Sequence, residues 1–189
     1  MKQLCTFGSS SESIERSYIA VAEELGREAA RRGCGVIYGA GKYGIMGAVS
    51  RGVRAEGGAL IGVSPDFFVE LDVLTEDYGE LLLTPTMRER KAVMEDKADA
   101  FVICPGGIGT FEEFFEVITL KQLGRHQKPI IILNTNGYYT PMLDMMEQCC
   151  AQQFMSEDVH RLFSVAESID EVFDQLENYS AFQYNKYKK

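Results

Sequence analysis

The stretch from Ala100 to Glu113 reads AFVICPGGIGTFEE, an apolar run that passes through three glycines into a helical pattern. An apolar run without polar alternation is typical of a strand that is covered on both faces of a parallel sheet. The same order of apolar run, loop and helical pattern recurs along the whole chain. This alternation predicts an α/β fold, namely a single-domain, Rossmann-like, doubly wound parallel sheet flanked by helices.

The apolar runs predict strands at Leu4–Phe7, Gly35–Tyr38, Ala59–Val63, Glu80–Leu83, Ala100–Cys104 and Pro129–Leu133. Helical periodicity predicts helices at Arg16–Arg32, Gly44–Ala55, Met87–Lys97, Thr110–Leu123, Tyr139–Gln153 and Ser168–Asn178. Gly33 stands where the first helix would stop. The least regular stretch, Asp66–Gly79, is expected to run over the surface. We expect one nucleotide-binding α/β domain over residues 1–178 and a loosely held tail over residues 179–189.

Composition and charge limit the classes of partner. The 189 residues, 46% of them hydrophobic and 25% charged, suit one globular domain with a full core. A formal net charge of −9 disfavours binding to a nucleic acid polymer, whose phosphates such a surface would repel. The N-terminal residues lack the apolar stretch of a signal peptide, and no later stretch resembles a membrane span. We therefore expect a cytoplasmic protein with no membrane partner.

The cysteines do not indicate a metal site. There are five of them, with no C-x-x-C pair, and the chain has only two histidines, His126 and His160. We expect reduced, mostly buried thiols and no zinc site.

Three loops rich in glycine or serine follow predicted strands, at Gly8–Ser11, Gly39–Gly47 and Pro105–Thr110. Ligands of doubly wound sheets bind beyond the carboxyl ends of the strands, near the point where the strand order reverses. These loops are therefore the candidate binding loops.

The loop at Pro105–Thr110 has the features of a phosphate site. Glycines at 106, 107 and 109 let backbone N–H groups approach an anion, and the helix that follows adds unpaired donors and a positive dipole end. The alternative interpretation is structural: Thr110 would cap the helix, and Glu113 would complete a capping box.

A second polar segment is Met87-Arg88-Glu89-Arg90-Lys91. Cations in the first turns of a helix oppose its dipole unless an anion shares the site, which favours a ligand near Arg90 and Lys91. The alternative is a solvated helix face, on which Glu89 and Glu95 partner the basic residues.

The loop Gly39–Gly47 contains G-x-G-x-x-G, which by itself indicates a dinucleotide fingerprint. The indication is weak, because that fingerprint belongs after the first strand, and the strand that follows this loop ends at Val63-Ser64-Pro65 without an acidic residue.

Two strings carry a resemblance to a known family. P-G-G-x-G-T-x-x-E at Pro105–Glu113 and M-x-x-R-K at Met87–Lys91 are similar to the hallmarks of the LONELY GUY (LOG) family of cytokinin-activating phosphoribohydrolases, often mislabelled as lysine decarboxylases. The similarity runs from about Leu4 to Glu177. It implies a homodimeric enzyme that hydrolyses the N-glycosidic bond of a nucleoside 5′-monophosphate, AMP or a cytokinin riboside 5′-monophosphate, to free base and ribose 5-phosphate. Base specificity and physiological role stay open.

The resemblance also implies the roles of individual residues. Arg90 and Glu113 would be catalytic. The substrate-binding residues would be Ser9, Gly41, Glu80, Lys91, Gly106, Gly107, Ile108, Gly109, Thr110, Phe111, Glu112 and Thr119. Glu80 could instead be a strand-end charge, and Thr119 could lie on a helix face and bond to its own turn. Two positions depart from the family pattern: Lys42 replaces a small residue, and Phe7 takes the place of a cysteine.

Cleavage of a base–ribose bond passes through an oxocarbenium-like sugar, which a nearby carboxylate would stabilise. Glu113 could supply it, with Arg90 anchoring the nucleotide and assisting departure of the base, and neither a metal nor an organic cofactor is required. Two alternatives are an NAD-type oxidoreductase that uses Gly39–Gly44 and a non-catalytic nucleotide-binding module. Amino-acid decarboxylation is disfavoured, because it needs a Schiff-base lysine and no context marks Lys42, Lys91 or Lys97 for that task.

Overall fold

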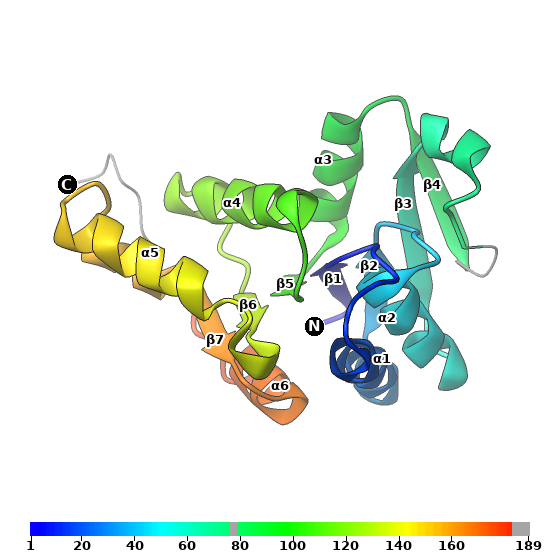
Figure 1. Cartoon of the computed structure of the whole chain (residues 1–189), viewed down its shortest axis with the longest axis horizontal. Helices are drawn as coiled ribbons and strands as arrows, with labels where there is room; N and C mark the ends of the chain where they lie inside the picture. The colour runs from blue at the N-terminus through cyan, green and yellow to red at the C-terminus, as the bar shows by residue number, and fades with distance from the viewer. Residues whose placement is uncertain (76–78, 183–189) are drawn as a thin grey trace.

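The computed structural model of the protein describes residues 1–75 and 79–182. Seven strands form one sheet in the order β4-β3-β2-β1-β5-β6-β7, and every neighbouring pair is parallel (Figure 1). The strands are β1 (Gln3–Phe7), β2 (Gly35–Tyr38), β3 (Leu60–Pro65), β4 (Glu80–Thr84), β5 (Ala100–Ile103), β6 (Ile130–Leu133) and β7 (Ser164–Ala166). The doubly wound parallel sheet predicted from the sequence is confirmed.

All six predicted strands are present, with ends that differ by at most two residues. The seventh, β7, was not predicted. It has only three residues, which is too short for an apolar pattern to stand out, and it forms by pairing with β6 at the sheet edge.

The six predicted helices are also present. They are α1 (Arg16–Arg31), α2 (Gly44–Ala55), α3 (Met87–Lys97), α4 (Ile108–Gln122), α5 (Thr140–Ala151) and α6 (Ile169–Glu177). Three short 3-10 helices, η1 (Asp66–Leu71), η2 (Thr135–Gly137) and η3 (Glu157–Arg161), complete the described elements. Gly33 follows α1 with a φ of 71°, as expected for a helix stop.

Two expectations fall partly on residues that the structure does not describe. Within the stretch expected to run over the surface, Asp66–Gly79, η1 is helical, and residues 76–78 lie outside the described part. Of the predicted tail, residues 183–189 lie outside it as well.

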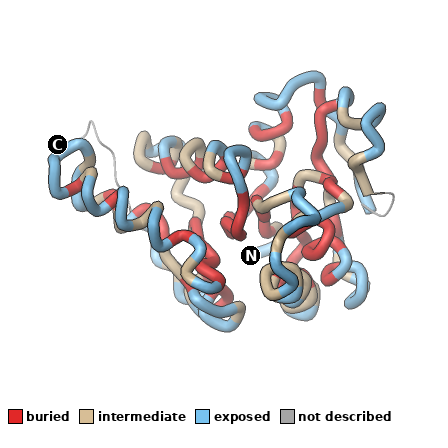
Figure 2. Tube along the Cα trace, viewed as in Figure 1, coloured by how far each residue is buried: buried red, intermediate tan, exposed pale blue. Residues whose placement is uncertain are grey.

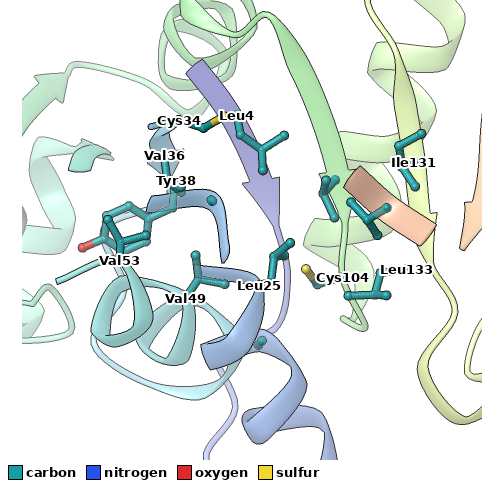
Figure 3. Packing of buried hydrophobic residues seen from close by; sticks show 14 of the residues in the cluster. Leu4, Leu25, Cys34, Val36, Tyr38, Val49, Val53, Cys104, Ile131 and Leu133 are labelled. Carbon is teal, nitrogen blue, oxygen red and sulfur yellow. The ribbon is translucent and has the colours of Figure 1, made fainter. Parts of the chain in front are cut away.

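Helices cover both faces of the sheet, and each face has its own core. On one face, Leu25 of α1 and Val49 of α2 pack on Leu4, Val36 and further residues of the strands (Figure 3). The other core combines side chains from α3, α4 and α5 with the alternate strand residues, among them Phe7, Ile37, Met94, Phe101 and Phe114. Figure 2 shows buried stretches along the strands and exposed residues on the outer turns of the helices. Each fully buried Leu or Phe side chain contributes about 1.5–3 kcal/mol to folding.

Helices α1 and α2 approach each other closely through glycine. A Cβ atom at Gly26 would lie 2.2 Å from the Val49 carbonyl oxygen, and one at Gly52 would lie 1.9 Å from the Glu23 carbonyl oxygen. The backbones of the two helices are therefore in direct contact at this crossing. This contact fixes α2 against α1, the helix that follows the loop after β1.

Strand β1 lies where the strand order reverses. The chain first adds β2, β3 and β4 on one side of β1 and then β5, β6 and β7 on the other. After the carboxyl ends of β1 and β5 the chain therefore continues to opposite faces of the sheet, into α1 on one face and α4 on the other. Doubly wound folds bind ligands at this point. In the described residues, no helix has the length and apolar character needed to cross a membrane.

Candidate active site

A cleft of about 410 Å³ lies at the carboxyl ends of β1 and β5. Its walls come from the end of β1 and the loop after it, the loop after β2, and the starts of α3 and α4, with single side chains from α2 and η1. The cleft is thus at the place that the strand order predicts for a ligand site.

The start of α4 is uncapped and open to the cleft. The N-cap residue is Gly107, no side chain caps the helix, and Gly107, Ile108 and Gly109 are exposed to the cleft. A Cβ atom at Gly107 or Gly109 would have no other part of the protein within 4 Å. Packing therefore does not require glycine at these two positions, and without a Cβ atom the backbone N–H groups are open to an approaching anion.

Gly106 has a different role. A Cβ atom there would lie 2.1 Å from the Thr110 hydroxyl oxygen and 3.0 Å from the Ser9 amide nitrogen. Gly106 therefore lets the loops after β1 and β5 meet, with the Thr110 side chain between them. The Tyr138 hydroxyl donates to the Gly106 carbonyl at 2.7 Å and holds the loop from the far side.

The capping-box interpretation of Thr110 and Glu113 was wrong. The helix begins two residues earlier than predicted, so Thr110 already lies inside the first turn. Glu113 turns away from the helix start, towards α3.

Glu113 forms a buried ion pair with Arg90. Arg90 Nη1 lies 2.5 Å from Glu113 Oε1, and the two side chains are only 8% and 9% exposed. Arg90 Nε also donates to the Val63 carbonyl at 3.2 Å. Burial raises the pKa of Glu113, and the neighbouring Arg90 charge opposes that rise. The guanidinium lies on Gly39, where a Cβ atom would be 2.2 Å from Arg90 Nη2.

The interpretation of the basic residues of α3 as a solvated face was wrong for two of them. Arg90 and Lys91 are each 6% exposed, and only Arg88 is on the surface. Lys91 pairs with Glu112 and Glu116 of α4, not with Glu89 or Glu95. At the start of α3, Thr86 is the N-cap: its hydroxyl oxygen accepts from the Glu89 amide, and the hydroxyl donates to the Glu89 carboxylate. The α3–α4 contact, which the isolated helix pattern does not show, selects these partners.

The start of α2 is not open in this way. The amides of Ile45 and Met46 donate to the Ser9 carbonyl at 2.8 Å and 3.3 Å. A Cβ atom at Gly44 would lie 2.6 Å from the same oxygen. The glycine pattern of this loop thus serves packing against the loop after β1, which removes support from the dinucleotide interpretation. Lys42 turns to Asp72, at 2.9 Å.

The structure brings seven of the expected site residues to the cleft, namely Ser9, Arg90, Gly107, Ile108, Gly109, Thr110 and Glu113. The others do not line it, namely Gly41, Glu80, Lys91, Gly106, Phe111, Glu112 and Thr119. Glu80 is the first residue of edge strand β4, four residues before its carboxyl end, or about 13 Å away. Thr119 lines a separate hollow of about 250 Å³ between α4 and α5.

Sequence reasoning missed the apolar wall of the cleft, which consists of Met46, Phe68 and Met87. Met87 belongs to the M-x-x-R-K string, in which the basic residues give the stronger chemical signal. Phe68 lies on η1, inside the irregular stretch, where periodicity gives no signal.

The chain is similar to known proteins. A family model described as "Possible lysine decarboxylase" matches residues 46–176. "Cytokinin riboside 5′-monophosphate phosphoribohydrolase LOG" from Oryza sativa subsp. japonica is 40% identical over 178 residues, which cover 94% of this chain and 74% of the relative. The LOG7 enzyme of the same description from Arabidopsis thaliana is 39% identical and covers 94% and 82%.

A solved structure supports the fold alone. The Moco carrier protein from Chlamydomonas reinhardtii is 19% identical, with a TM-score of 0.71 over 93% of this chain and 95% of its own. The sequence relatives and the matched family model show that the chain belongs to the LONELY GUY family, whose model carries the older description of possible lysine decarboxylases.

Proposed function

We propose that the chain hydrolyses the N-glycosidic bond of a nucleoside 5′-monophosphate, either AMP or a cytokinin riboside 5′-monophosphate, to free base and ribose 5-phosphate. The observation that carries this proposal is one cleft that holds both an uncapped helix start and a buried Arg90–Glu113 pair. The names of the Oryza and Arabidopsis relatives describe the same reaction.

The 5′-phosphate binds at the start of α4. The amides of Ile108, Gly109 and Thr110 belong to the first turn, where N–H groups have no partner within the helix. A helix of 15 residues adds its positive dipole end. The hydroxyls of Ser9 and Thr110 line the same part of the cleft and can donate to phosphate oxygens.

Glu113 lies one turn deeper along α4 than Gly109. In a nucleotide whose phosphate binds at Gly109, the ribose would therefore lie next to the Glu113 carboxylate. As the C1′–N bond breaks, its electron pair goes to the base, and positive charge develops on the ribose. Glu113 stabilises that charge and orients the water that adds to C1′. Arg90 opposes the rise in the pKa of Glu113 that burial causes, and it assists the leaving base. The base takes up the proton that is released when water adds its hydroxyl to C1′.

The base lies against the apolar wall of Met46, Phe68 and Met87. These three side chains lie in the same cleft as the polar α4 start, so a phosphate and a flat apolar base can bind together. Binding energy from the phosphate then helps to place the sugar, which favours monophosphates over nucleosides.

The reaction can be tested by chromatography of the products from AMP, its N6-prenylated analogue and adenosine. We expect free base and ribose 5-phosphate from the monophosphates, and at least tenfold lower kcat/KM with adenosine. Nucleotide that raises Tm without release of base would instead indicate a binding module, and bound-cofactor absorbance would indicate an oxidoreductase. The decarboxylase description has little support, because no lysine is among the described residues that line the cleft.

Gly109→Ala tests the phosphate site. The added methyl group meets no protein atom, and alanine is favoured in a helix, so Tm should stay equal or rise slightly. The methyl group should hold the phosphate away from the amides, which costs about 1.5–3 kcal/mol for one charged hydrogen bond, or roughly ten- to a hundredfold in kcat/KM for AMP. The rate with adenosine should change little.

Gly106→Ala is the matched control, because its methyl group meets Thr110 and the Ser9 backbone. It should lower Tm as well as activity. Wild-type kcat/KM for AMP in Gly109→Ala would show that the phosphate binds elsewhere.

We further propose a cytoplasmic homodimer, on the strength of the family resemblance. Light scattering should give twice the chain mass of 21.1 kDa, and cell fractionation would test the compartment.

A further inference from the structure

We propose a second site, for a divalent metal ion of the Zn²⁺ type, in a cluster that the cleft does not use. The α5 cluster consists of Glu147 and Cys150 on α5 and Glu157 and His160 on η3. Ligand atoms of Cys150, Glu157 and His160 all lie within 4.8 Å of one another. His160 Nε2 lies 3.5 Å from Cys150 Sγ and 3.4 Å from Glu147 Oε1.

Local structure explains why these four side chains converge. Glu147 and Cys150 are three residues apart on an α-helix and share a face. Glu157 and His160 are three residues apart on a 3-10 helix, where such positions are eclipsed. Gln153, with a φ of 63°, reverses the chain between the helices. The sequence pattern is therefore E-x-x-C followed by E-x-x-H, with a turn that folds one pair onto the other.

The two distances from His160 Nε2, to Cys150 Sγ and to Glu147 Oε1, are compatible with tetrahedral coordination. Zinc binds thiolate sulfur at about 2.3 Å, imidazole nitrogen at about 2.0–2.1 Å and carboxylate oxygen at about 2.0–2.2 Å, which places neighbouring ligand atoms roughly 3.3–3.6 Å apart. The Sγ–Nε2 and Nε2–Oε1 separations of 3.5 Å and 3.4 Å fall in this range. Glu157 is exposed, so a side-chain rotation can bring its carboxylate to the fourth position.

Charge also favours a cation. Glu147 and Glu157 place two carboxylates beside a thiol and one imidazole, and the ion-pair partner shown for Glu147 is His160 itself. The basic residue of η3 nearest in sequence, Arg161, pairs with Asp158 at 3.7 Å. Thiolate, imidazole and carboxylate together are a ligand set of zinc.

The sequence-based expectation of no zinc site rested on the missing C-x-x-C pair and the scarcity of histidine. Ligands paired as E-x-x-C and E-x-x-H give neither of these signals. An ion here would join the end of α5 to η3. It would thereby hold Met155 and Val159 in place, which line the hollow between α4 and α5. The expected role is structural, so the inference stands or falls independently of the proposed hydrolase activity.

Titration of the full chain with Co²⁺ tests the site. We expect one Co²⁺ per chain, visible absorption of tetrahedral cobalt and a near-ultraviolet thiolate-to-cobalt band, all displaced by Zn²⁺. At a Zn²⁺ concentration a hundredfold above Kd, Tm should rise by about 5 to 10 °C. The thiolate band should disappear in Cys150→Ser, and affinity should fall at least tenfold in His160→Gln.

Matched controls separate the site from general thiol or imidazole binding. Cys149→Ser changes the neighbouring cysteine, and His126→Gln changes the other histidine, so both should keep the band. Glu147→Gln alters a side chain that is 64% exposed, so it should fold normally, as circular dichroism would check, and bind more weakly. A wild-type chain without the thiolate band, or a band that is lost in Cys149→Ser and kept in Cys150→Ser, would overturn the proposal.

Discussion

Glu113→Gln is expected to lower kcat for AMP hydrolysis by roughly a hundredfold to ten-thousandfold while AMP still binds. The amide has nearly the same shape as the carboxylate but no charge, so it cannot stabilise the positive ribose or polarise the attacking water. The phosphate contacts at the start of α4 are untouched, so the Kd for AMP should change much less than kcat.

Folding must be monitored in parallel, because the substitution leaves the Arg90 guanidinium buried beside a neutral group. The amide oxygen can still accept from Arg90 Nη1, but the buried guanidinium has lost its counter-charge, and we expect a loss of about 3–5 kcal/mol in unfolding free energy. Glu116→Gln is the control: it lies one turn further along α4 and pairs with Lys91 outside the cleft. Its kcat should stay within about twofold of wild type. AMP hydrolysis by Glu113→Gln at near wild-type rate would remove Glu113 from the mechanism.

The sequence was sufficient for most of the fold because the central strands are buried on both faces. Residues such as Val36 and Phe101 are fully buried and belong to uninterrupted apolar runs. The start of α4 was misplaced for a physical reason. A Thr followed three residues later by Glu matches a capping box, and only tertiary structure shows that Glu113 is already bound to Arg90.

The candidate site was predictable from the sequence where its residues are contiguous. Gly107, Gly109 and Thr110 come from one loop, and helix-terminus chemistry alone indicates an anion there. The pairing of Arg90 with Glu113 joins two helices across 23 residues, and no local pattern predicts it. Only the family resemblance connected these two residues. Phe68 reaches the cleft from η1 through tertiary folding, so neither periodicity nor a motif could place it.

The second large effect is expected for Arg90→Gln, on stability as well as on activity. This change leaves the Glu113 carboxylate buried without its cation, which typically costs 3–5 kcal/mol. For a chain of this length, Tm should fall by roughly 6 to 20 °C. Loss of the group that assists the leaving base should also reduce kcat, so calorimetry and the AMP assay should both change.

The pH dependence of that loss has a definite sign. In the wild type, burial raises the pKa of Glu113 and Arg90 opposes the rise. Without Arg90 the pKa of Glu113 rises further in the folded variant. Between the ordinary carboxyl pKa and this raised pKa, the folded variant keeps a proton on Glu113 that the unfolded chain has released. The stability of Arg90→Gln should therefore be greatest at acid pH and fall as pH rises through the raised pKa. Urea unfolding at pH 5 and pH 8 would measure the unfolding free energies of the variant and the wild type. If the difference between the two proteins were the same at both pH values, the prediction would be contradicted.

The double variant Arg90→Gln/Glu113→Gln separates stability from catalysis. With both charges removed, two amides of similar shape can hydrogen-bond to each other, and no unpaired charge stays buried. Unfolding free energy should recover by about 2–4 kcal/mol relative to Arg90→Gln alone, because the uncompensated buried charge is gone. Hydrolysis should not recover, because neither the carboxylate nor the guanidinium is present. Should activity return together with stability, the pair would only hold α3 against α4, and the groups that cleave the glycosidic bond would have to be sought elsewhere in the cleft.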